Sequence, residues 1–575
     1  MLDKAAVARA LREIGMLLEV KGENPFKVRA YEAGARALED ADEDLPALVA
    51  SGRLRELRGI GEALAKKIAD LHATGRTDLL DRLRAELPKG ILELVQVPDL
   101  GPKKIAALRD ALGIASLAEL EAACRDGRVR EVKGFGARTE ARILENLARM
   151  SARRPTRVLL SDALDTADRV LRHLRGAAPV ERLDVAGSAR RMKETVADLD
   201  LVASSTRPAE VSEALTAFPL ATETLARGDT KTTVRLASGL QVDLRVVAPE
   251  DHAAALHHLT GSKAHHVKLR GLARERGYSL SEYGLARIDG GEPIKVGSEA
   301  ELYAKLGLPF IPPELREDEG EIEAAQAGTL PTDLVRIEDV RGMVHCHTRW
   351  SDGRATVEEM ALAADALGME YLTITDHSPS AHYAGGLDAD RLERQWDEIA
   401  RVQEGVRVRL LRGTESDITE EGALDFPDRI LERLDVIVAS VHARFRMDEG
   451  AMTRRLIRCM ELPLFKIWGH ARGRLLLERD PFDCRMEEVL DALARSRGAV
   501  EVNGDPHRLE LEPRFLRLAR ERGIPIVLSV DAHSTGALGY LRFAVATARR
   551  GWVRRGEVLN ALPFEAFQAA VRPAP

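Results

Sequence analysis

The chain has few cysteines and aromatic residues, and it has no long uncharged apolar run. Its four cysteines, Cys124, Cys346, Cys459 and Cys484, are far apart and show no CxxC spacing. A disulfide framework or a zinc finger is therefore not expected, and a reducing cytoplasm is the predicted compartment. No apolar run is long enough to cross a bilayer, and the first residues, MLDKAAVARALREIG, lack the apolar core of a signal peptide. The sequence predicts a cytoplasmic protein without a membrane partner.

An overall excess of positive charge is also absent. The formal net charge is −7 over 575 residues, with 45% hydrophobic and 31% charged residues. This balance indicates a globular protein and does not mark the whole chain as a nucleic-acid binder. Metal sites need carboxylates, however, so basic surfaces can be local and hidden in the sum. The length by itself suggests about three to five domains.

The first 150 residues have apolar positions at helical spacing, and one pattern recurs in them about every 35–40 residues. The copies are LRGIG at 57–61, VPDLG at 97–101 and VKGFG at 132–136. Each leads into a predicted helix with an apolar residue seven positions on. A glycine turn at a helix N-terminus presents backbone N–H groups to a phosphate, and the three copies resemble the helix-hairpin-helix motif. The alternative is ordinary glycine turns in a helical bundle. The predicted DNA contacts are Gly59, Gly61, Gly101, Gly134 and Gly136.

The middle of the chain carries a glycine-serine turn followed by paired aspartates. Residues 182–186 alternate as in a strand, and Gly187-Ser188 breaks that strand into a tight turn whose N–H groups can hold a phosphate. Two arginines follow as phosphate partners. On the next predicted strand Asp198 and Asp200 are two residues apart, so both side chains leave the same face. Paired carboxylates on one face suit a divalent cation.

A third carboxylate is expected from a neighbouring strand, and Asp243 supplies it within the alternating run 240–246. Three carboxylates opposite a triphosphate grip can hold two Mg²⁺ ions about 3.5–4 Å apart, one activating a hydroxyl and one steadying the leaving group. An isolated DxD is more often a solvated polar face, but here the glycine-serine turn stands about ten residues upstream. The pattern predicts a nucleotidyl-transfer site that uses Mg²⁺ or Mn²⁺.

These residues resemble the family X DNA polymerases, the group that includes the eukaryotic beta polymerase. The resemblance implies that Gly187, Ser188 and Arg191 bind the nucleoside triphosphate and that the three aspartates bind metal. It makes Asp243 the general base or the group that orients the 3′ hydroxyl. Lys67 falls on the position of a lysine that forms a Schiff base with deoxyribose phosphate in this family. The alternative, which we favour, is that Lys67 is a plain phosphate contact.

A further stretch resembles the subdomain of the same family that closes over the incoming nucleotide. It reads TGS at 260–262, then a basic helix, then SEYG at 281–284, and it implies that Gly261 lies at the nucleotide. His266 stands where the family often has Asn reaching toward the base edge. For His257 and His265 we expect a solvated helix face.

In the C-terminal part, polar residues stand where apolar runs end. Helical patterns lie between these runs at 356–367, 388–403, 485–497 and 512–522. Strand and helix in repeated alternation predict a barrel-like (β/α) fold with its site at one end. Alternation along the first strand puts His345 and His347 on one face, as two ligands of one ion require. Nine such side chains are candidate metal ligands: His345, His347, Asp352, His377, Glu415, His442, His470, Asp531 and His533.

This set resembles the polymerase and histidinol phosphatase (PHP) domain, in which every ligand position has a counterpart here. The resemblance implies a distorted (β/α)7 barrel holding Zn²⁺ and/or Mn²⁺, up to three ions. Mixed histidine and carboxylate ligands favour phosphoester hydrolysis, because the metal lowers the pKa of a bound water. Arg444, Arg472 and the loop 503–508 stand near the strand ends, where they can clamp a DNA phosphate.

The predicted fold class is multidomain α+β and α/β: an all-α helix-hairpin-helix region, a nucleotidyltransferase palm and a distorted (β/α)7 PHP barrel. The predicted domains are an N-terminal helical domain with the first hairpin at 1–90, a helix-hairpin-helix DNA-binding domain at 91–152, the palm at 153–250, the nucleotide-closing subdomain at 251–313, an acidic linker at 314–333 and the PHP domain at 334–575.

The order of these parts resembles the bacterial family X polymerases. The resemblance implies a DNA-directed DNA polymerase that fills short gaps in base-excision repair, with gapped or primed double-stranded DNA and deoxynucleoside triphosphates as partners. A monomer is the default expectation. The resemblance also implies a metal-dependent 3′→5′ exonuclease in the PHP domain. Abasic-site endonuclease or lyase activity is a further activity that the resemblance suggests. One alternative is a PHP phosphoesterase or nuclease whose palm acts only as a DNA clamp. A non-enzymatic DNA-binding scaffold is disfavoured, since clustered buried carboxylates are costly without metal.

Overall fold

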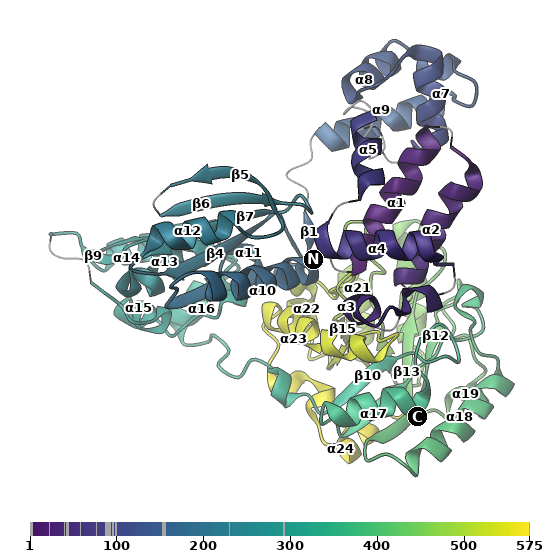
Figure 1. The fold of residues 1–575 in the computed structure, drawn as a ribbon. Helices are drawn as coiled ribbons and strands as arrows, with labels where there is room; N and C mark the ends of the chain where they lie inside the picture. Colours follow the sequence, from purple (N-terminus) through teal and green to yellow (C-terminus); the bar gives the residue numbers. More distant parts are fainter. Residues whose placement is uncertain are drawn as a thin grey trace. The chain divides into compact units, whose positions relative to one another are not determined.

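The computed structural model describes residues 4–21, 23–39, 41, 45–57, 59–75, 77–86, 94, 97, 100–151, 157–228, 230–290 and 294–573. Figure 1 labels the helices and strands of the chain, which divides into two compact units. The first contains Met1–Thr156, Ala217–Thr224 and Val234–Leu240, and the second contains Arg157–Thr216, Leu225–Thr233 and Gln241–Pro575. Among the described residues, no helix combines the length and the apolar character needed to span a membrane.

The described residues before position 152 are helices and turns, as predicted. The elements are α1 (Lys4–Val20), α2 (Pro25–Glu39), α3 (Leu45–Ala50), η1 (Arg53–Glu56), α4 (Glu62–Thr74), α5 (Asp78–Glu86), α7 (Pro102–Leu112), α8 (Leu117–Arg125), η2 (Val129–Glu131) and α9 (Ala137–Ser151). The apolar residues seven positions after each glycine turn, Ile68, Leu108 and Ile143, are buried in one shared core. The helical spacing therefore identified the core faces of the three helices that follow the turns.

The palm is a five-stranded sheet with the order β2-β4-β7-β6-β5. Its elements are β1 (Val158–Leu159), α10 (Leu160–Ala177), β2 (Arg182–Val185), α11 (Gly187–Arg190), β3 (Thr195–Val196), β4 (Asp198–Ser204), α12 (Pro208–Thr216), β5 (Ala221–Arg227), β6 (Lys231–Leu236) and β7 (Gln241–Val247). Strand β4 runs parallel to β7 and antiparallel to β2. Buried and half-buried residues alternate along β7, so its apolar residues form the core while its polar residues share one face.

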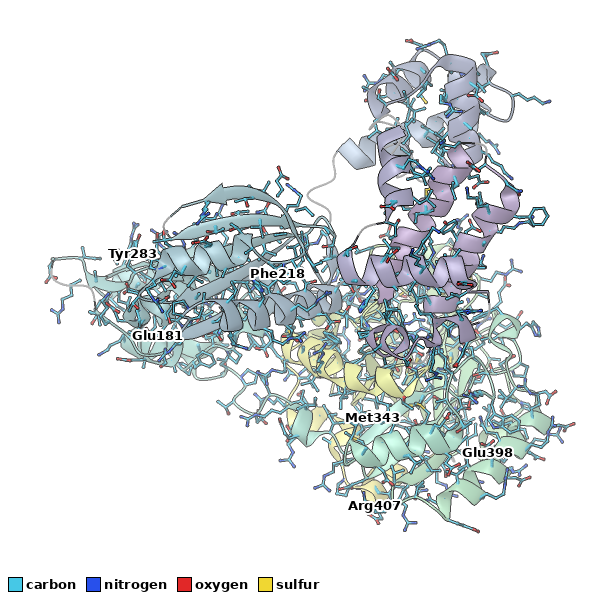
Figure 2. All side chains as sticks on the ribbon, in the orientation of Figure 1. Glu181, Phe218, Tyr283, Met343, Glu398 and Arg407 are labelled. Atoms are coloured by element: carbon cyan, nitrogen blue, oxygen red, sulfur yellow. The ribbon has the colours of Figure 1, made fainter. Side chains whose placement is uncertain are left out.

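The nucleotide-closing subdomain follows the palm directly. It contains η3 (Pro249–Asp251), α13 (His252–Thr260), α14 (Lys263–Glu275), β8 (Tyr278–Ser281), β9 (Gly284–Arg287), α15 (Glu299–Lys305), η4 (Pro313–Leu315) and α16 (Glu321–Ala327). The side chain of Ser262 caps α14 by accepting a hydrogen bond from the backbone N–H of His265. Tyr283, in the turn between β8 and β9, is exposed (Figure 2).

Two expectations for this subdomain are corrected by the structure. The acidic segment 314–333 is not a separate linker, because its apolar residues, among them Ile322 and Leu330, pack in the same core as the subdomain. His265 is fully buried rather than solvated, with Nδ1 2.5 Å from Glu321 Oε1 and Nε2 2.9 Å from the Tyr303 hydroxyl. His257 is buried on the same hydroxyl. The acidic run looked like a solvated linker because the partners of its carboxylates, such as His265 for Glu321 and Arg191 for Glu317, lie far away in the sequence.

The C-terminal part is a parallel barrel with the strand order β10-β11-β12-β13-β14-β15-β16. The strands are β10 (Gly342–Cys346), β11 (Tyr371–Ile374), β12 (Arg409–Asp417), β13 (Val436–Ser440), β14 (Lys466–Trp468), β15 (Gly498–Asn503) and β16 (Ile526–Ser529). A parallel bridge between Cys346 and Ala532 joins the first strand to the residues after the last, so the barrel is nearly closed. The predicted fold class is confirmed.

Helices follow the strands in the alternation that the sequence predicted. They are α17 (Val357–Ala366), η6 (His382–Ala384), α18 (Ala389–Gln403), α19 (Asp428–Leu431), α20 (Glu449–Met460), α21 (Met486–Arg495), α22 (Pro513–Glu521), η7 (Thr535–Tyr540), α23 (Leu541–Arg550) and α24 (Phe564–Val571), with short 3-10 turns η5 (Ile337–Asp339), η8 (Arg555–Glu557) and η9 (Leu559–Ala561).

Strand alternation separates two apolar cores in this domain. Val436 and Val438 of β13 join a cluster that includes Phe567 of α24, whereas Ile437 joins the cluster that contains the other helices. Met343 of β10 belongs to the second cluster. One end of the barrel interior is thus filled by apolar side chains, and the carboxyl ends of the strands carry the polar residues.

Candidate active sites

The Gly187-Ser188 turn of the palm places its backbone close to Asp200. Gly187 begins α11 immediately after β2 and has φ +60°. A Cβ built on Gly187 would lie 2.0 Å from Asp200 Oδ2, and the positive φ disfavours any side chain. The Ala186 N–H donates to the backbone oxygen of Asp200 at 2.8 Å. Only glycine permits this close approach of the turn to the β4 carboxylate.

The three palm aspartates lie on adjacent parallel strands. Asp198 and Asp200 are both half-buried on one face of β4, and Asp200 is in register with Asp243 of β7. Burial, and then the neighbouring carboxylates, raise the pKa of Asp200 to about 7. Asp243 accepts hydrogen bonds from Thr233 Oγ1 at 2.5 Å and Gln241 Nε2 at 2.7 Å. Crowded carboxylates fit a divalent cation, because its charge offsets their mutual repulsion.

A cavity joins the turn, the β4 aspartates and the closing subdomain. Of the predicted residues it is lined by Gly187, Ser188, Arg191, Asp198, Asp200 and Gly261; Asp243 is not part of its lining. Lys263 and Arg270 of α14 and the hydrogen-bonded pair His258 and His266 line it too. The basic helix after the TGS turn was the sequence signal for Lys263 and Arg270, which were not among the predicted nucleotide-binding residues.

The two arginines after the turn have different environments. Arg190 pairs with the buried Glu299 at 2.6 Å, so it joins the palm to the closing subdomain. Arg191 lines the cavity, pairs with Glu317 at 2.9 Å and donates to the Thr260 carbonyl. Arg191 is therefore the arginine available to a ligand in the cavity, in competition with Glu317.

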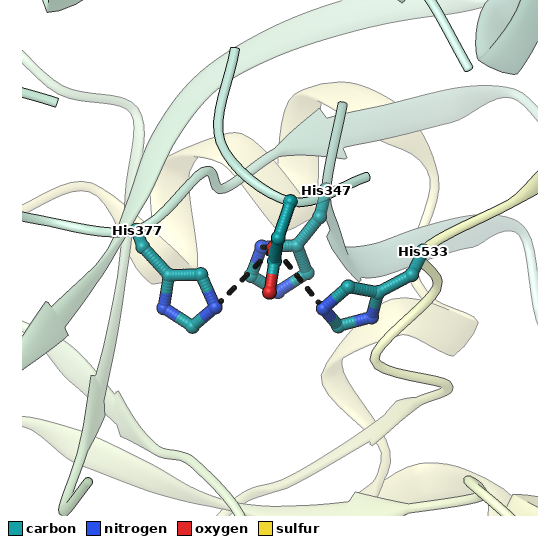
Figure 3. A group of neighbouring side chains, drawn as sticks. His347, His377 and His533 are labelled. Carbon is teal, nitrogen blue, oxygen red and sulfur yellow. Dashed lines mark ion pairs between the residues drawn. The ribbon is translucent and has the colours of Figure 1, made fainter. Parts of the chain in front are cut away.

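The nine candidate ligands of the barrel converge at the carboxyl ends of the strands. Their ligand atoms form four groups, in each of which all atoms lie within 4.8 Å of one another. The groups are His347, Asp352, His377 and His533; His345, His470 and Asp531; His345, His347 and Glu415; and His377, Glu415 and His442. Figure 3 shows the imidazoles of His347, His377 and His533 gathered in this site. Asp352 Oδ1 lies 3.5 Å from His377 Nε2 and 3.3 Å from His533 Nε2.

Glu415 lies at the middle of the set and is almost fully buried. Its carboxylate lies 2.7 Å from His470 Nε2 and 3.0 Å from His377 Nδ1. Burial by itself raises the pKa of Glu415, but the surrounding imidazoles, His442 first, lower it well below its ordinary value. A carboxylate that keeps its charge and is shared by several imidazoles can bridge more than one cation.

The donor set fits metal ions. His345 Nε2, His377 Nδ1 and Glu415 Oε2 are buried and lie at ion-pair distances within the set, 3.0 Å between His377 Nδ1 and Glu415 Oε2, but none of them makes a hydrogen bond of good geometry among the described residues. Burial, with the neighbouring His533 and His377, lowers the pKa of His347 to about 3, which keeps that imidazole neutral. Unpaired buried polar atoms are costly, and neutral imidazoles are the form that binds metal. A cation at these atoms would satisfy them.

The backbone at three ligands departs from regular strand geometry. His345, His470 and Asp531 have φ values of +64°, +21° and +50°, and the register of β10 against β11 shifts between Met343 and Cys346. His345 and His347 therefore reach the cluster through a bulge rather than through the simple alternation that we predicted. Such backbone outliers concentrate at functional sites.

Sequence reasoning missed the carboxylates that orient the ligands. Glu501 of β15 is fully buried, and its Oε1 lies 2.5 Å from His345 Nδ1. Asp417 Oδ1 lies 3.2 Å from His442 Nδ1. Such partners fix the ring orientation of a ligand. The available signal was a single acidic residue inside the apolar run GAVEVN, since a lone buried charge requires a partner.

Only one of the predicted phosphate-clamping segments reaches the cluster. Arg472 is buried and pairs with Glu512 at 2.8 Å. Arg444 is exposed and pairs with Glu420 at 3.3 Å. Arg508, in the loop after β15, lies with Nε 3.1 Å from Oδ2 of the candidate ligand Asp531.

Each of the three glycine turns of the helical region contains the same type of backbone hydrogen bond. The N–H groups of Ile60, Leu100 and Phe135 donate to carbonyls three residues earlier, at 3.0, 3.1 and 2.9 Å. Gly59 and Gly134 both have φ +93°. A Cβ at Gly61, Gly101, Gly134 or Gly136 would meet nothing within 4 Å. The turns therefore offer open backbone surface at helix N-termini, as a phosphate contact requires.

Lys67 lies on α4, one helix turn from Ala63. Its Nζ donates to the Ala63 carbonyl at 3.3 Å, and its side chain is half-buried. This placement is compatible with either of the roles considered for it.

Family models match four segments of the chain. They are a helix-hairpin-helix domain at residues 3–77, a SAM-like helix-hairpin-helix tandem at 91–149, the DNA polymerase beta thumb at 255–317 and the PHP domain at 344–504.

Similar proteins cover either the whole chain or the barrel alone. A protein of Bacillus subtilis (strain 168) named DNA polymerase/3′-5′ exonuclease PolX is 36% identical over 574 residues, which is 99% of this chain and 100% of that protein. A probable phosphatase of Caldicellulosiruptor bescii is 31% identical over 206 residues, 34% of this chain and 80% of that protein. A probable phosphatase of Caldanaerobacter subterraneus is 31% identical over 207 residues, 33% of this chain and 74% of that protein.

Proposed function

Because the chain belongs to the family X DNA polymerases that carry a C-terminal PHP domain, we propose that it fills short gaps in DNA during base-excision repair and shortens 3′ ends with its barrel. The observation that carries this proposal is the presence of two complete and separate constellations in one chain, the palm cavity with its aspartates and the nine converging side chains of the barrel. The first suits nucleotidyl transfer, and the second suits phosphoester hydrolysis.

In the palm, we assign the triphosphate of a deoxynucleotide to the turn. The backbone N–H groups of Gly187 and Ser188 and the guanidinium of Arg191 bind its oxygens, and Arg191 leaves Glu317 to do so. Mg²⁺ or Mn²⁺ held by the aspartates would neutralise the phosphates and lower the pKa of the primer 3′ hydroxyl. Asp243 accepts the proton of that hydroxyl or orients it. Gly261 lines the nucleotide side of the cavity.

In the barrel, the nine side chains would hold up to three ions, Zn²⁺ and/or Mn²⁺. Such ions supply an activated water at neutral pH. The chain's own contribution is orientation, because Glu501 and Asp417 each contact the Nδ1 of a candidate ligand, His345 and His442 respectively. The DNA end enters from the open end of the barrel.

We assign the DNA backbone to the glycine turns, with Gly59, Gly61, Gly101, Gly134 and Gly136 leaving room for phosphates. Gapped or primed double-stranded DNA is the expected partner, and the acting species is a monomer. Lys67 binds a phosphate in this scheme. A Schiff base at the same lysine, and cleavage at abasic sites, are the additional activities to test.

The test is extension of a primer across a one-nucleotide gap with Mg²⁺ or Mn²⁺, together with shortening of the same primer when nucleotides are left out. Asp198→Ala should abolish extension and keep shortening, and His345→Ala should do the reverse. Asp168→Ala, which removes an exposed carboxylate from α10, serves as the control and should keep both. A wild type that only shortens the primer would support the alternative, a PHP nuclease whose palm acts as a DNA clamp.

A further inference from the structure

Arg508 brings spare hydrogen-bonding capacity to the edge of the barrel cluster. Its Nε lies 3.1 Å from Asp531 Oδ2, while its Nη1 is buried and makes no hydrogen bond among the described residues. The side chain is still 16% exposed. An arginine placed only to neutralise Asp531 would not need an unsatisfied second nitrogen, because a buried donor without a partner is costly. A planar fork with a free donor beside metal ligands is suited to a phosphate oxygen.

Tyr383 stands at the same end of the barrel with its ring exposed. Tyr383 is 71% exposed. Its ring lies edge-on to the imidazoles of two candidate ligands, with ring centroids 6.1 Å apart for His377 and 6.3 Å apart for His442. A large exposed aromatic side chain at the mouth of a charged cluster is not explained by core packing. Its ring offers a face to a planar ligand.

The loop that carries Tyr383 is firmly held. Arg391 Nη1 donates to the carbonyls of Gly385 and Gly386 at 2.7 and 3.1 Å. The N–H and hydroxyl of Ser380 donate to the carboxylate of Asp425 at 2.6 and 2.5 Å. A Cβ at Gly386 would lie 1.9 Å from the Ser378 carbonyl oxygen, so the loop packs closely on the strand end. An exposed ring on an ordered loop can bind a base at low entropic cost.

We propose that Arg508 and Tyr383 form the subsite for the 3′-terminal nucleotide. Arg508 binds a non-bridging oxygen of the last phosphodiester, and Tyr383 stacks on the terminal base. Hydrolysis forms a bond from the water oxygen to phosphorus and breaks the bond to the 3′ oxygen of the preceding nucleotide. That oxygen receives the water proton, and a nucleoside 5′-monophosphate is released. Stacking tolerates every base, so the subsite predicts removal of any terminal nucleotide. This inference rests on the proposed exonuclease activity.

The test uses the full-length protein with Mn²⁺ and a single strand whose last base is 2-aminopurine. A methylene group in place of the bridging 3′ oxygen of the last linkage makes the strand resistant to hydrolysis and keeps both non-bridging oxygens, so binding is read without turnover. Stacking of the terminal base on Tyr383 should quench its fluorescence. This local signal is the primary readout, because the glycine turns also bind DNA.

We expect Tyr383→Ala to abolish the quenching and Tyr383→Phe to retain it. For Arg508→Gln, the protein concentration for half-maximal quenching should rise about tenfold, which corresponds to a loss of about 1.4 kcal/mol in binding free energy. Arg407→Gln removes the same charge before the start of β12, at the opposite end of the barrel from the ligands, and should stay within about twofold of wild type.

Full quenching by Tyr383→Ala would overturn the assignment of Tyr383. An unchanged concentration for Arg508→Gln would overturn that of Arg508, and so would recovery to the wild-type value at saturating Mn²⁺, because Arg508 would then act on the ligand Asp531. Digestion of an unprotected strand is followed in parallel. If wild type releases no nucleotide while quenching still depends on Tyr383, the proposed exonuclease fails and the subsite stands.

Discussion

Replacing Glu501 with glutamine should weaken metal binding in the barrel without disturbing the palm. The Glu501 carboxylate is fully buried and accepts from His345 Nδ1 at 2.5 Å, from the Ser529 hydroxyl at 2.6 Å and from the backbone N–H of His470 at 2.5 Å. Glutamine has the same shape, but its amide nitrogen would face one of these donors. The ring of His345 would lose its anionic partner, so His345 would be a weaker and less well oriented ligand.

The loss follows from the size of such contacts. Removing a carboxylate that orients a ligand costs about 10–100-fold in metal affinity, which corresponds to about 1.4–2.8 kcal/mol. Two of the four ligand groups contain His345, so we expect weaker uptake of part of the metal complement. Shortening of a 3′ end should fall at limiting metal and recover at excess metal, whereas gap filling should stay unchanged.

The assay is titration of the metal-stripped protein with Zn²⁺ or Mn²⁺ by isothermal calorimetry, with the bound ions counted by mass spectrometry. Glu432→Gln, which changes an exposed glutamate, serves as the matched control. If Glu501→Gln binds metal within about twofold of wild type while it is folded and active in gap filling, the reasoning that His345 depends on Glu501 is wrong.

Three further predictions concern the palm, its packing and the glycine turns. Gly187→Ala should lower gap-filling kcat/KM about 100-fold, since its Cβ would lie 2.0 Å from Asp200 Oδ2 and displacing a catalytic group by about 1 Å costs that much; barrel activity measured on the same sample should not change. Burial by itself raises the pKa of Glu194, but Arg550 and then Arg474 lower it to about 2 from an ordinary 4.5. The ionised carboxylate therefore adds about 3 kcal/mol to the free energy of unfolding above pH 4.5, and this contribution is lost as the pH falls toward 2. In Glu194→Gln, hydrogen exchange of α23 should therefore be faster at pH 7 and lose that acid dependence; exchange equal to wild type would contradict the ion pair. Gly136→Ala should leave the melting temperature unchanged, because its Cβ meets nothing within 4 Å, yet weaken DNA binding measured by anisotropy; unaltered binding would remove this turn from the DNA interface.

Features carried by short spacing could be predicted from the sequence. The glycine turns, the paired aspartates on β4 and the polar residues at successive strand ends each depend on residues that are close in the chain, where helix and strand periods fix which side chains share a face. The helices of the barrel region were predicted within a few residues of their observed bounds for the same reason. The nine candidate ligands could be collected because each one lies within or after the end of an apolar run.

Features that depend on distant partners could not be predicted. The burial of His265 depends on Glu321, 56 residues away, and Glu501 acts on His345 across 156 residues. Among the predicted phosphate-binding residues, no local pattern favours Arg508 over Arg444, because the choice depends on which loop lies beside Asp531.

The sequence by itself determined the kinds of chemistry that this chain carries, because residue type and local spacing specify a phosphate-binding turn, paired carboxylates and a set of imidazoles. Only the tertiary structure decided which charges are satisfied and which are left over for a ligand. That distinction depends on desolvation and on partners brought together by the barrel and the palm, and a buried group such as Glu501 or Arg508 acquires its role from those neighbours.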